Sequence, residues 1–70
     1  MENTKIATRD GAIRLGQFLK LANLIDSGAD AKHLLARQIV QVNGATETRR
    51  GRQLRRGDVV RYNDATYEVA

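Results

Sequence analysis

The stretch from Val40 to Val60 reads VQVNGATETRRGRQLRRGDVV and decides the fold of the second half of the chain. Alternating valines precede the turn signal Asn43-Gly44, and a second turn signal, Gly57-Asp58, precedes a pair of valines. Both are patterns of strands next to turns. Between the two turns the alternation lapses. We therefore predict a short strand plus an irregular loop there, held between two better-defined strands.

A cluster of arginines occupies this loop. From Arg49 to Arg61 there are six arginines and one acid, Asp58, so the segment carries +5 while the rest of the chain sums to −1. Because all six are arginine rather than lysine, the cluster favours flat, bidentate recognition of phosphate. A solvated face that only aids solubility is the usual alternative for a charge run. We favour binding because the rest of the chain is close to neutral.

The composition is that of one small basic domain. The chain has 70 residues, a net charge of +4, a pI of about 10.1 and no cysteine, so hydrophobic packing must hold it together. A basic domain concentrates nucleic acid or an anionic membrane around itself, and composition alone does not choose between them. No apolar run approaches the roughly 20 residues of a membrane span, so we expect a cytoplasmic protein. Three aromatic residues are too few for a base-stacking platform.

Hydrophobic periodicity predicts two helices. The first runs from about Leu15 to Leu24, with an apolar stripe at helical spacing made of Leu15, Phe18, Leu19 and Ala22 and widened by Leu21, Leu24 and Ile25. Gln17, Lys20 and Asn23 form a row on its polar face. The second runs from about Gly28 to Gln38, with Ser27 as its N-cap and the stripe Ala31, Leu34 and Leu35. Two short helices so closely joined predict a helical hairpin.

The remaining pattern predicts strands. A short edge strand is expected at Thr4 to Thr8, and further strands near 40–42, 59–62 and 66–69, the last two joined by a turn at Asn63-Asp64. The whole chain, residues 1–70, is then a single α+β domain in which the helices pack on a small, mostly antiparallel sheet. We expect its core to contain Leu15, Phe18, Leu19, Leu34, Leu35, Val40, Val42 and Val59.

The order and spacing of five motifs resemble a known family. They are Ile13-Arg14-Leu15 at the first helix start, 27–32 at the second, the Val40–Gly44 hairpin, Gly57–Val60, and Arg49–Arg52, a run also found in short stand-alone bacterial members. Together they resemble the RNA-binding module named after the fourth protein of the small ribosomal subunit. Its core, the alpha-L motif, is a helix-turn-helix plus strands, here about residues 13–60.

The resemblance implies binding of structured RNA, typically ribosomal or transfer RNA. We expect a ribosome-associated monomer with no membrane partner. Carried over position by position, the resemblance implies RNA contacts from both helices and the loop, namely Arg14, Gln17, Lys20, Ser27, Lys32, Arg49, Arg50 and Arg52. Ser27 is equally well explained as a helix cap, and a helix N-terminus itself favours anions. The family usually has Gly where this chain has Gln38, so the sequence does not decide at which residue the second helix ends.

The residues that catalysis needs are scarce. His33 is the single histidine, there is no cysteine, and no paired carboxylates stand at ligand spacing. We expect His33 at the surface and Asp58 hydrogen-bonded to the backbone of its turn. The glycines form no phosphate-binding loop of the dinucleotide or Walker type. The sequence therefore predicts a protein that is not an enzyme and needs no cofactor or metal.

Three other functions compete with RNA binding. A ubiquitin-like sulfur carrier shares Val-Asn-Gly and Gly-Asp-Val, but carriers are activated at a C-terminal Gly-Gly and this sequence ends Glu68-Val69-Ala70. Duplex DNA binding would place the second helix in the major groove, where its exposed side chains are a poor set for base edges. An interaction module that docks on an acidic protein partner stays open.

Overall fold

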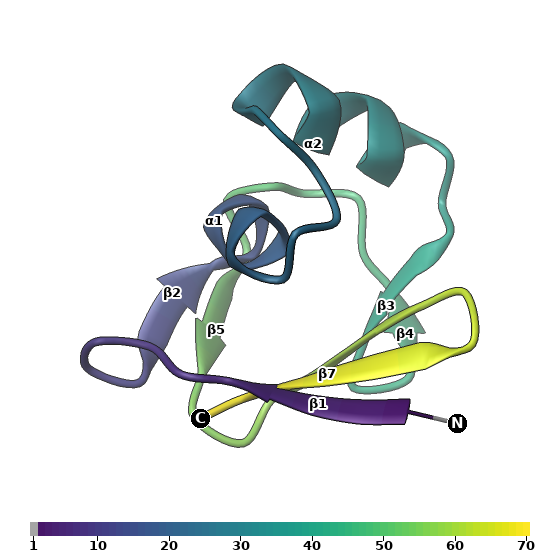
Figure 1. The fold of residues 1–70 in the computed structure, drawn as a ribbon. Coiled ribbons are helices and arrows are strands. Elements are labelled where there is room, and N and C mark those ends of the chain that lie inside the picture. The colour runs from purple at the N-terminus through teal and green to yellow at the C-terminus, as the bar shows by residue number, and fades with distance from the viewer. Residues whose placement is uncertain (1) are drawn as a thin grey trace.

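The structure, a computed structural model, describes residues 2–70 and has the predicted α+β class, with two helices lying over the strands (Figure 1). In chain order the elements are β1 (Glu2–Ile6), β2 (Ala12–Arg14), α1 (Leu15–Leu21), α2 (Gly28–Ala36), β3 (Val40–Val42), β4 (Ala45–Thr46), β5 (Gln53–Arg55), β6 (Val59–Tyr62) and β7 (Ala65–Val69).

Five strands form the main sheet, in the order β1-β7-β6-β3-β4. All neighbours are antiparallel except β1 and β7, which run parallel with Ile6 opposite Val69. The predicted N-terminal edge strand is confirmed as an edge strand, although it ends at Ile6 rather than Thr8. The β3–β4 turn has positive φ at Asn43 (51°) and Gly44 (87°), as a two-residue hairpin turn with Asn-Gly requires.

A separate two-stranded ribbon is formed by β2 and β5, which lie side by side beneath α1 in Figure 1. β5 fits the strand expected within the arginine-rich segment. β2 was not predicted, because it has three residues and only its middle one, Ile13, turns toward the interior, which leaves no alternation to detect. α1 then begins directly at Leu15, as predicted.

Both helices end earlier than predicted. α1 stops at Leu21 because Asn23 takes a left-handed conformation (φ 65°). Its N–H donates to the Lys20 carbonyl (3.0 Å), and the N–H of Leu24 donates to that of Leu19 (3.0 Å), the paired bonds of a Schellman ending. Leu21, predicted to widen the apolar stripe, is 55% exposed. Asn23 is no longer helical, so the predicted row with Gln17 and Lys20 is broken.

α2 ends at Ala36, and Gln38 is the residue at which the chain turns away from the helix. Gln38 itself adopts a left-handed conformation (φ 61°), and its N–H donates to the Leu35 carbonyl at 3.0 Å. The chain therefore reverses at the position where glycine is usual, with a residue that pays a steric cost there.

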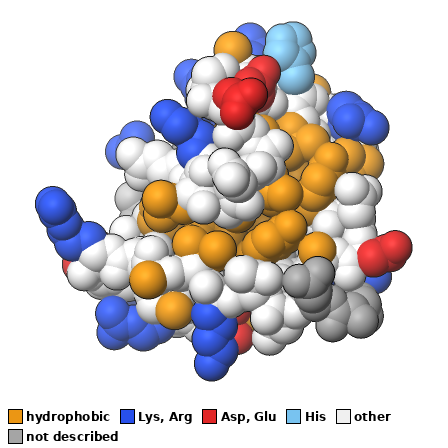
Figure 2. All heavy atoms as spheres, in the orientation of Figure 1, with side chains coloured by type: hydrophobic (Ala, Val, Ile, Leu, Met, Phe, Trp, Pro, Cys, Tyr) orange, Lys and Arg blue, Asp and Glu red, His pale blue; other side chains and the backbone are white. Residues whose placement is uncertain are grey.

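The core lies between the helices and the main sheet. Of the predicted core residues, the leucines, Phe18, Val40 and Val42 are buried, but Val59 is only partly buried. Its neighbour Val60 is fully buried, because successive residues of β6 face opposite sides of the sheet. In Figure 2 hydrophobic side chains form a band between the helices and the strands, with Lys and Arg around the rim of this face.

Phe18→Ala should lower the free energy of unfolding by about 3 to 5 kcal/mol, because Phe18 is fully buried in a core this small. The measurement is denaturant unfolding followed by circular dichroism. Leu21→Ala on the same helix is the matched control and should change stability little. Equal denaturation midpoints for the two variants would contradict the assignment of the helix faces.

Candidate nucleic-acid interface

A buried carboxylate, Glu47, organises the segment from Thr48 to Arg52, here called the arginine loop. Its Oε2 accepts hydrogen bonds from the backbone N–H groups of Thr48 and Arg49 and from Arg49 Nε, each at 3.0 Å. Its Oε1 accepts from Arg49 Nη2 at 3.2 Å and Arg52 Nη1 at 3.0 Å. Both oxygens of the Glu47 carboxylate thus accept hydrogen bonds from the protein, and the residue is only 6% exposed.

The hydrogen bonds to Glu47 shift its titration strongly. Those from the Arg49 side chain and backbone, and then from Arg52, lower the pKa of Glu47 from 4.5 to about 2. The same contact raises the pKa of Arg49. At neutral pH Glu47 is therefore fully ionised, and one negative charge is shared between two guanidinium groups.

The arginine loop also caps α1. No side chain caps this helix at Arg14, but the N–H of Leu15 donates to the Arg52 carbonyl (2.8 Å) and that of Gly16 to the Arg50 carbonyl (2.9 Å). These bonds satisfy two N–H groups that a helix start leaves without partners. The arginine loop and α1 are therefore fixed to each other through the backbone.

Gly16 lies at this close approach. A Cβ at Gly16 would lie 3.4 Å from both the Cβ and the carbonyl oxygen of Arg50, at the lower end of ordinary van der Waals contact. On the other side, a Cβ at Gly28 would lie 3.9 Å from Arg50 Nη1. The Arg50 side chain consequently extends from α1 toward the start of α2.

α1, α2 and the arginine loop enclose a groove of about 350 Å³, here called the basic groove. It receives cationic side chains from Arg14, Lys20 and Arg50, and no acidic residue lines it. Small residues and Gln17 complete it: Gly16, Gln17, Gly28, Ala31 and Gly51. Among the described residues, none of the three cations forms an ion pair. The groove thus concentrates uncompensated positive charge where two helices and a loop converge.

The predicted contact residues separate into three groups. Arg14, Gln17, Lys20 and Arg50 come together in the basic groove. Arg49 and Arg52 point back to Glu47, with side chains 74% and 34% exposed respectively. Ser27 and Lys32 are exposed on α2 but do not line the groove, and Ser27 Oγ caps the helix by accepting from the Asp30 N–H at 3.4 Å.

Glu47 was missed by the sequence reasoning. The available signal was its position as the single acid immediately before an arginine run, at the end of a hairpin strand. Asp58, in contrast, was predicted correctly, because its Oδ2 accepts from the Arg55 N–H at 2.8 Å.

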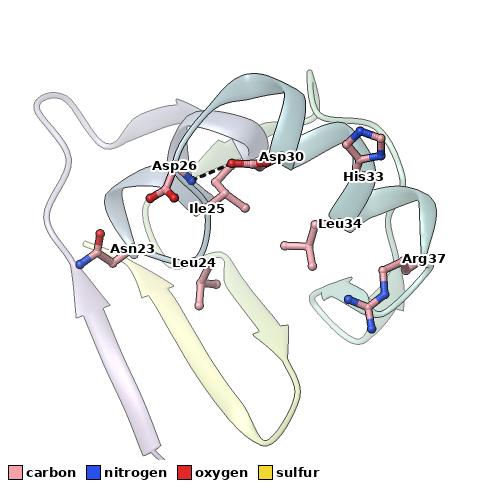
Figure 3. Close-up of a pocket in the computed structure, with 8 residues that line it drawn as sticks. All are labelled: Asn23, Leu24, Ile25, Asp26, Asp30, His33, Leu34 and Arg37. Atoms are coloured by element: carbon pink, nitrogen blue, oxygen red, sulfur yellow. Dashed lines mark hydrogen bonds between the residues drawn. The ribbon is translucent and has the colours of Figure 1, made fainter.

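A second hollow, of about 400 Å³, has a different character (Figure 3). It lies between the α1–α2 connection and α2. Its lining side chains combine two acids with His33 and Arg37 and with four uncharged residues: Asp26, Asp30, His33, Arg37, Asn23, Leu24, Ile25 and Leu34. Asp30 accepts from the Asp26 N–H at 3.3 Å. His33 is exposed, as predicted. Because acids and cations are mixed here, this hollow is a poor site for a polyanion.

No helix within residues 2–70 is long and apolar enough to cross a membrane. In the same part of the chain, no three His, Cys, Asp or Glu side chains gather as a metal ion would need.

Comparison with known proteins identifies the family. The S4 domain matches residues 6–70, nearly the whole chain, and the chain belongs to this family. The resemblance inferred from the sequence motifs is therefore confirmed. The chain is also 56% identical over 48 residues to the probable ribosome maturation protein RlbA of Bacillus subtilis (strain 168), a match that covers 69% of this chain and 68% of that protein.

Glu47→Gln should lower the free energy of unfolding at pH 7 by about 1.5 to 3 kcal/mol, the range for hydrogen bonds to a charged group. Because the folded pKa lies below the ordinary value, ionised Glu47 stabilises the fold above pH 4.5, and this contribution is lost as the pH falls toward 2. The variant should therefore show a flatter acid limb, measured by denaturant unfolding from pH 7 to pH 2.

Asp64→Asn, which removes an exposed carboxyl group from the β6–β7 turn, is the control and should change stability by less than about 0.5 kcal/mol. A Glu47→Gln curve that parallels the wild-type curve throughout this pH range would contradict the assigned role of the carboxylate.

Proposed function

We propose that this chain is a non-catalytic RNA-binding protein that recognises structured RNA by shape and phosphate contacts. The observation that carries the proposal is the basic groove, where Arg14, Lys20 and Arg50 converge from three segments without an acid among its lining residues. Membership of the S4 domain family supports it. The two helices and the following loop would then correspond to the alpha-L motif, with residues 1–70 forming one RNA-binding domain around a core at about 13–60.

Several features favour a folded RNA over an unpaired strand. Phe18 is fully buried, and Tyr62 and Tyr67 are partly buried against the core, so no aromatic platform is available for stacking bases. A-form RNA hides its base edges in a deep groove and presents phosphates and 2′-hydroxyl groups. Cations that β2, α1 and the arginine loop hold in fixed positions match a fixed arrangement of phosphates.

The predicted contact residues would contribute unequally to RNA binding. Arg14, Lys20 and Arg50 bring full charges, because no carboxylate of the described chain pairs with them. Arg49 and Arg52 share one carboxylate, so together they contribute one net charge, but the exposed Arg49 still has N–H groups to offer. Ser27 and Lys32, on the outer side of α2, would contact RNA that extends past the groove.

The biological setting is inferred from the relative. RlbA of Bacillus subtilis carries a name that assigns it to ribosome maturation, and the matched part covers about two thirds of each chain. We propose that this protein likewise acts on ribosomal RNA in the cytoplasm, as a monomer and without a cofactor. Transfer RNA is the other structured RNA that the same surface would fit.

The test is binding of a ribosomal RNA hairpin at several salt concentrations, measured by fluorescence anisotropy. If about three to five phosphates are neutralised, log affinity should fall with log salt at a slope of roughly −2 to −4. The double variant Lys20→Ala/Arg50→Ala should flatten this slope by about two. The control Arg61→Ala removes one positive charge outside the groove, on β6, where the Arg61 Nε donates to the Asn63 carbonyl, and should leave the slope nearly unchanged.

Two results would overturn the proposal. Equal slopes for the double variant and Arg61→Ala would remove the basic groove from the site. Tighter binding of poly-glutamate than of the hairpin at the same salt concentration would favour docking on an acidic protein.

A further inference from the structure

The outer face of the β2–β5 ribbon is a second exposed basic surface. In this ribbon Ala12 pairs with Arg55 and Arg14 with Gln53, and all four residues are exposed. Ile13 and Leu54, the middle pair, turn inward, and Leu54 is fully buried. Because strand side chains alternate between faces, the four exposed residues share one face of the ribbon.

This face carries two cations and no acid. Arg14 and Arg55 stand diagonally across the two strands, a placement that leaves their Cβ atoms roughly 7 to 8 Å apart. Two acids flank the ribbon along the chain, and both are engaged: Asp10 accepts from the Ala12 backbone N–H at 3.3 Å, and Asp58 accepts from the Arg55 backbone N–H at 2.8 Å and from Asn43 Nδ2 at 3.2 Å. The guanidinium groups of Arg14 and Arg55 have no carboxylate partner within the described residues.

The ribbon face is continuous with the basic groove through a shared residue. Arg14 is the last residue of β2 and also lines the groove. The backbone joins the same two regions, because β5 follows directly from the arginine loop whose carbonyls cap α1. A ligand in the groove that continues past Arg14 would therefore meet Gln53 and Arg55.

We propose that the outer face of the β2–β5 ribbon binds a base-paired stem of the RNA across its minor groove. The minor groove of A-form RNA is wide and shallow and displays 2′-hydroxyl groups, so an exposed two-stranded face can lie on it. Arg14 and Arg55 would contact phosphates, and the Gln53 amide, which has both donors and an acceptor, would bond 2′-hydroxyl groups. This inference rests on the proposed RNA binding and names its ligand as a stem next to the segment in the groove.

The experiment compares two probes, an RNA hairpin with a base-paired stem and a matched hairpin whose stem carries 2′-deoxyribose. Arg55→Ala should weaken binding of the RNA hairpin about fivefold to tenfold and flatten its salt slope by about one. Gln53→Ala should reduce the preference for the RNA stem over the deoxyribose stem while leaving the salt slope unchanged. Arg61→Ala, again the control, should change neither quantity.

The outcomes separate this inference from the proposed function. If Lys20→Ala/Arg50→Ala weakens binding but Arg55→Ala behaves like Arg61→Ala, the groove stands and the ribbon proposal is wrong. If neither variant alters binding, both the proposed function and the ribbon proposal fail.

Thermal unfolding of each variant checks the fold, and Arg55→Gln, which keeps a long polar side chain, should reproduce the loss of affinity if Arg55→Ala proves unstable. Retention of full affinity by Arg55→Gln would overturn the ribbon proposal.

Discussion

The rest of the basic surface depends on the contact between the Glu47 carboxylate and the arginine loop. Five hydrogen bonds converge on this carboxylate, from two backbone N–H groups and two guanidinium groups. They fix the loop, and the loop then supplies the carbonyls that cap α1. The backbone N–H of Glu47 also donates to the Val40 carbonyl at 2.9 Å, which ties the arrangement to β3. Sheet, loop and helix are thus held in one frame.

An ion pair between a buried carboxylate and partly exposed guanidinium groups is a weak source of net stability, because solvent screens the arginines and desolvation of the carboxylate offsets part of the attraction. Its effect here is better understood as positional. Without Glu47 the segment would be a flexible cationic loop that loses conformational entropy on binding, whereas a loop already held in place has little left to lose. Glu47 partly neutralises Arg49 and Arg52, whereas Arg50 has no carboxylate partner among the described residues and extends into the groove between the helices.

Local patterns in the sequence predicted most of the fold. Periodicity located both helix starts, alternation located β3, β6 and β7, and Asn-Gly located the hairpin turn. The errors arose where strand pairing, a buried partner or the conformation of a single residue decides the structure. β2 exists because it pairs with β5 across the chain, and the direction of the Arg49 side chain depends on a buried acid. Helix ends were misjudged because Asn23 and Gln38 take left-handed conformations in place of glycine.

Charge is distributed unequally around α2, and this asymmetry constrains how a polyanion can approach. The helix presents Gly28 and Ala31 to the basic groove, whereas Asp30, His33 and Arg37 line the opposite hollow (Figure 3). The small residues leave the groove open, whereas the carboxylates of Asp26 and Asp30 in the other hollow would disfavour the approach of a polyanion there. Under the proposed function, a folded RNA would approach on the side where Arg50 meets the start of α2, and the proposed ribbon site would continue its contacts from Arg14 to Arg55.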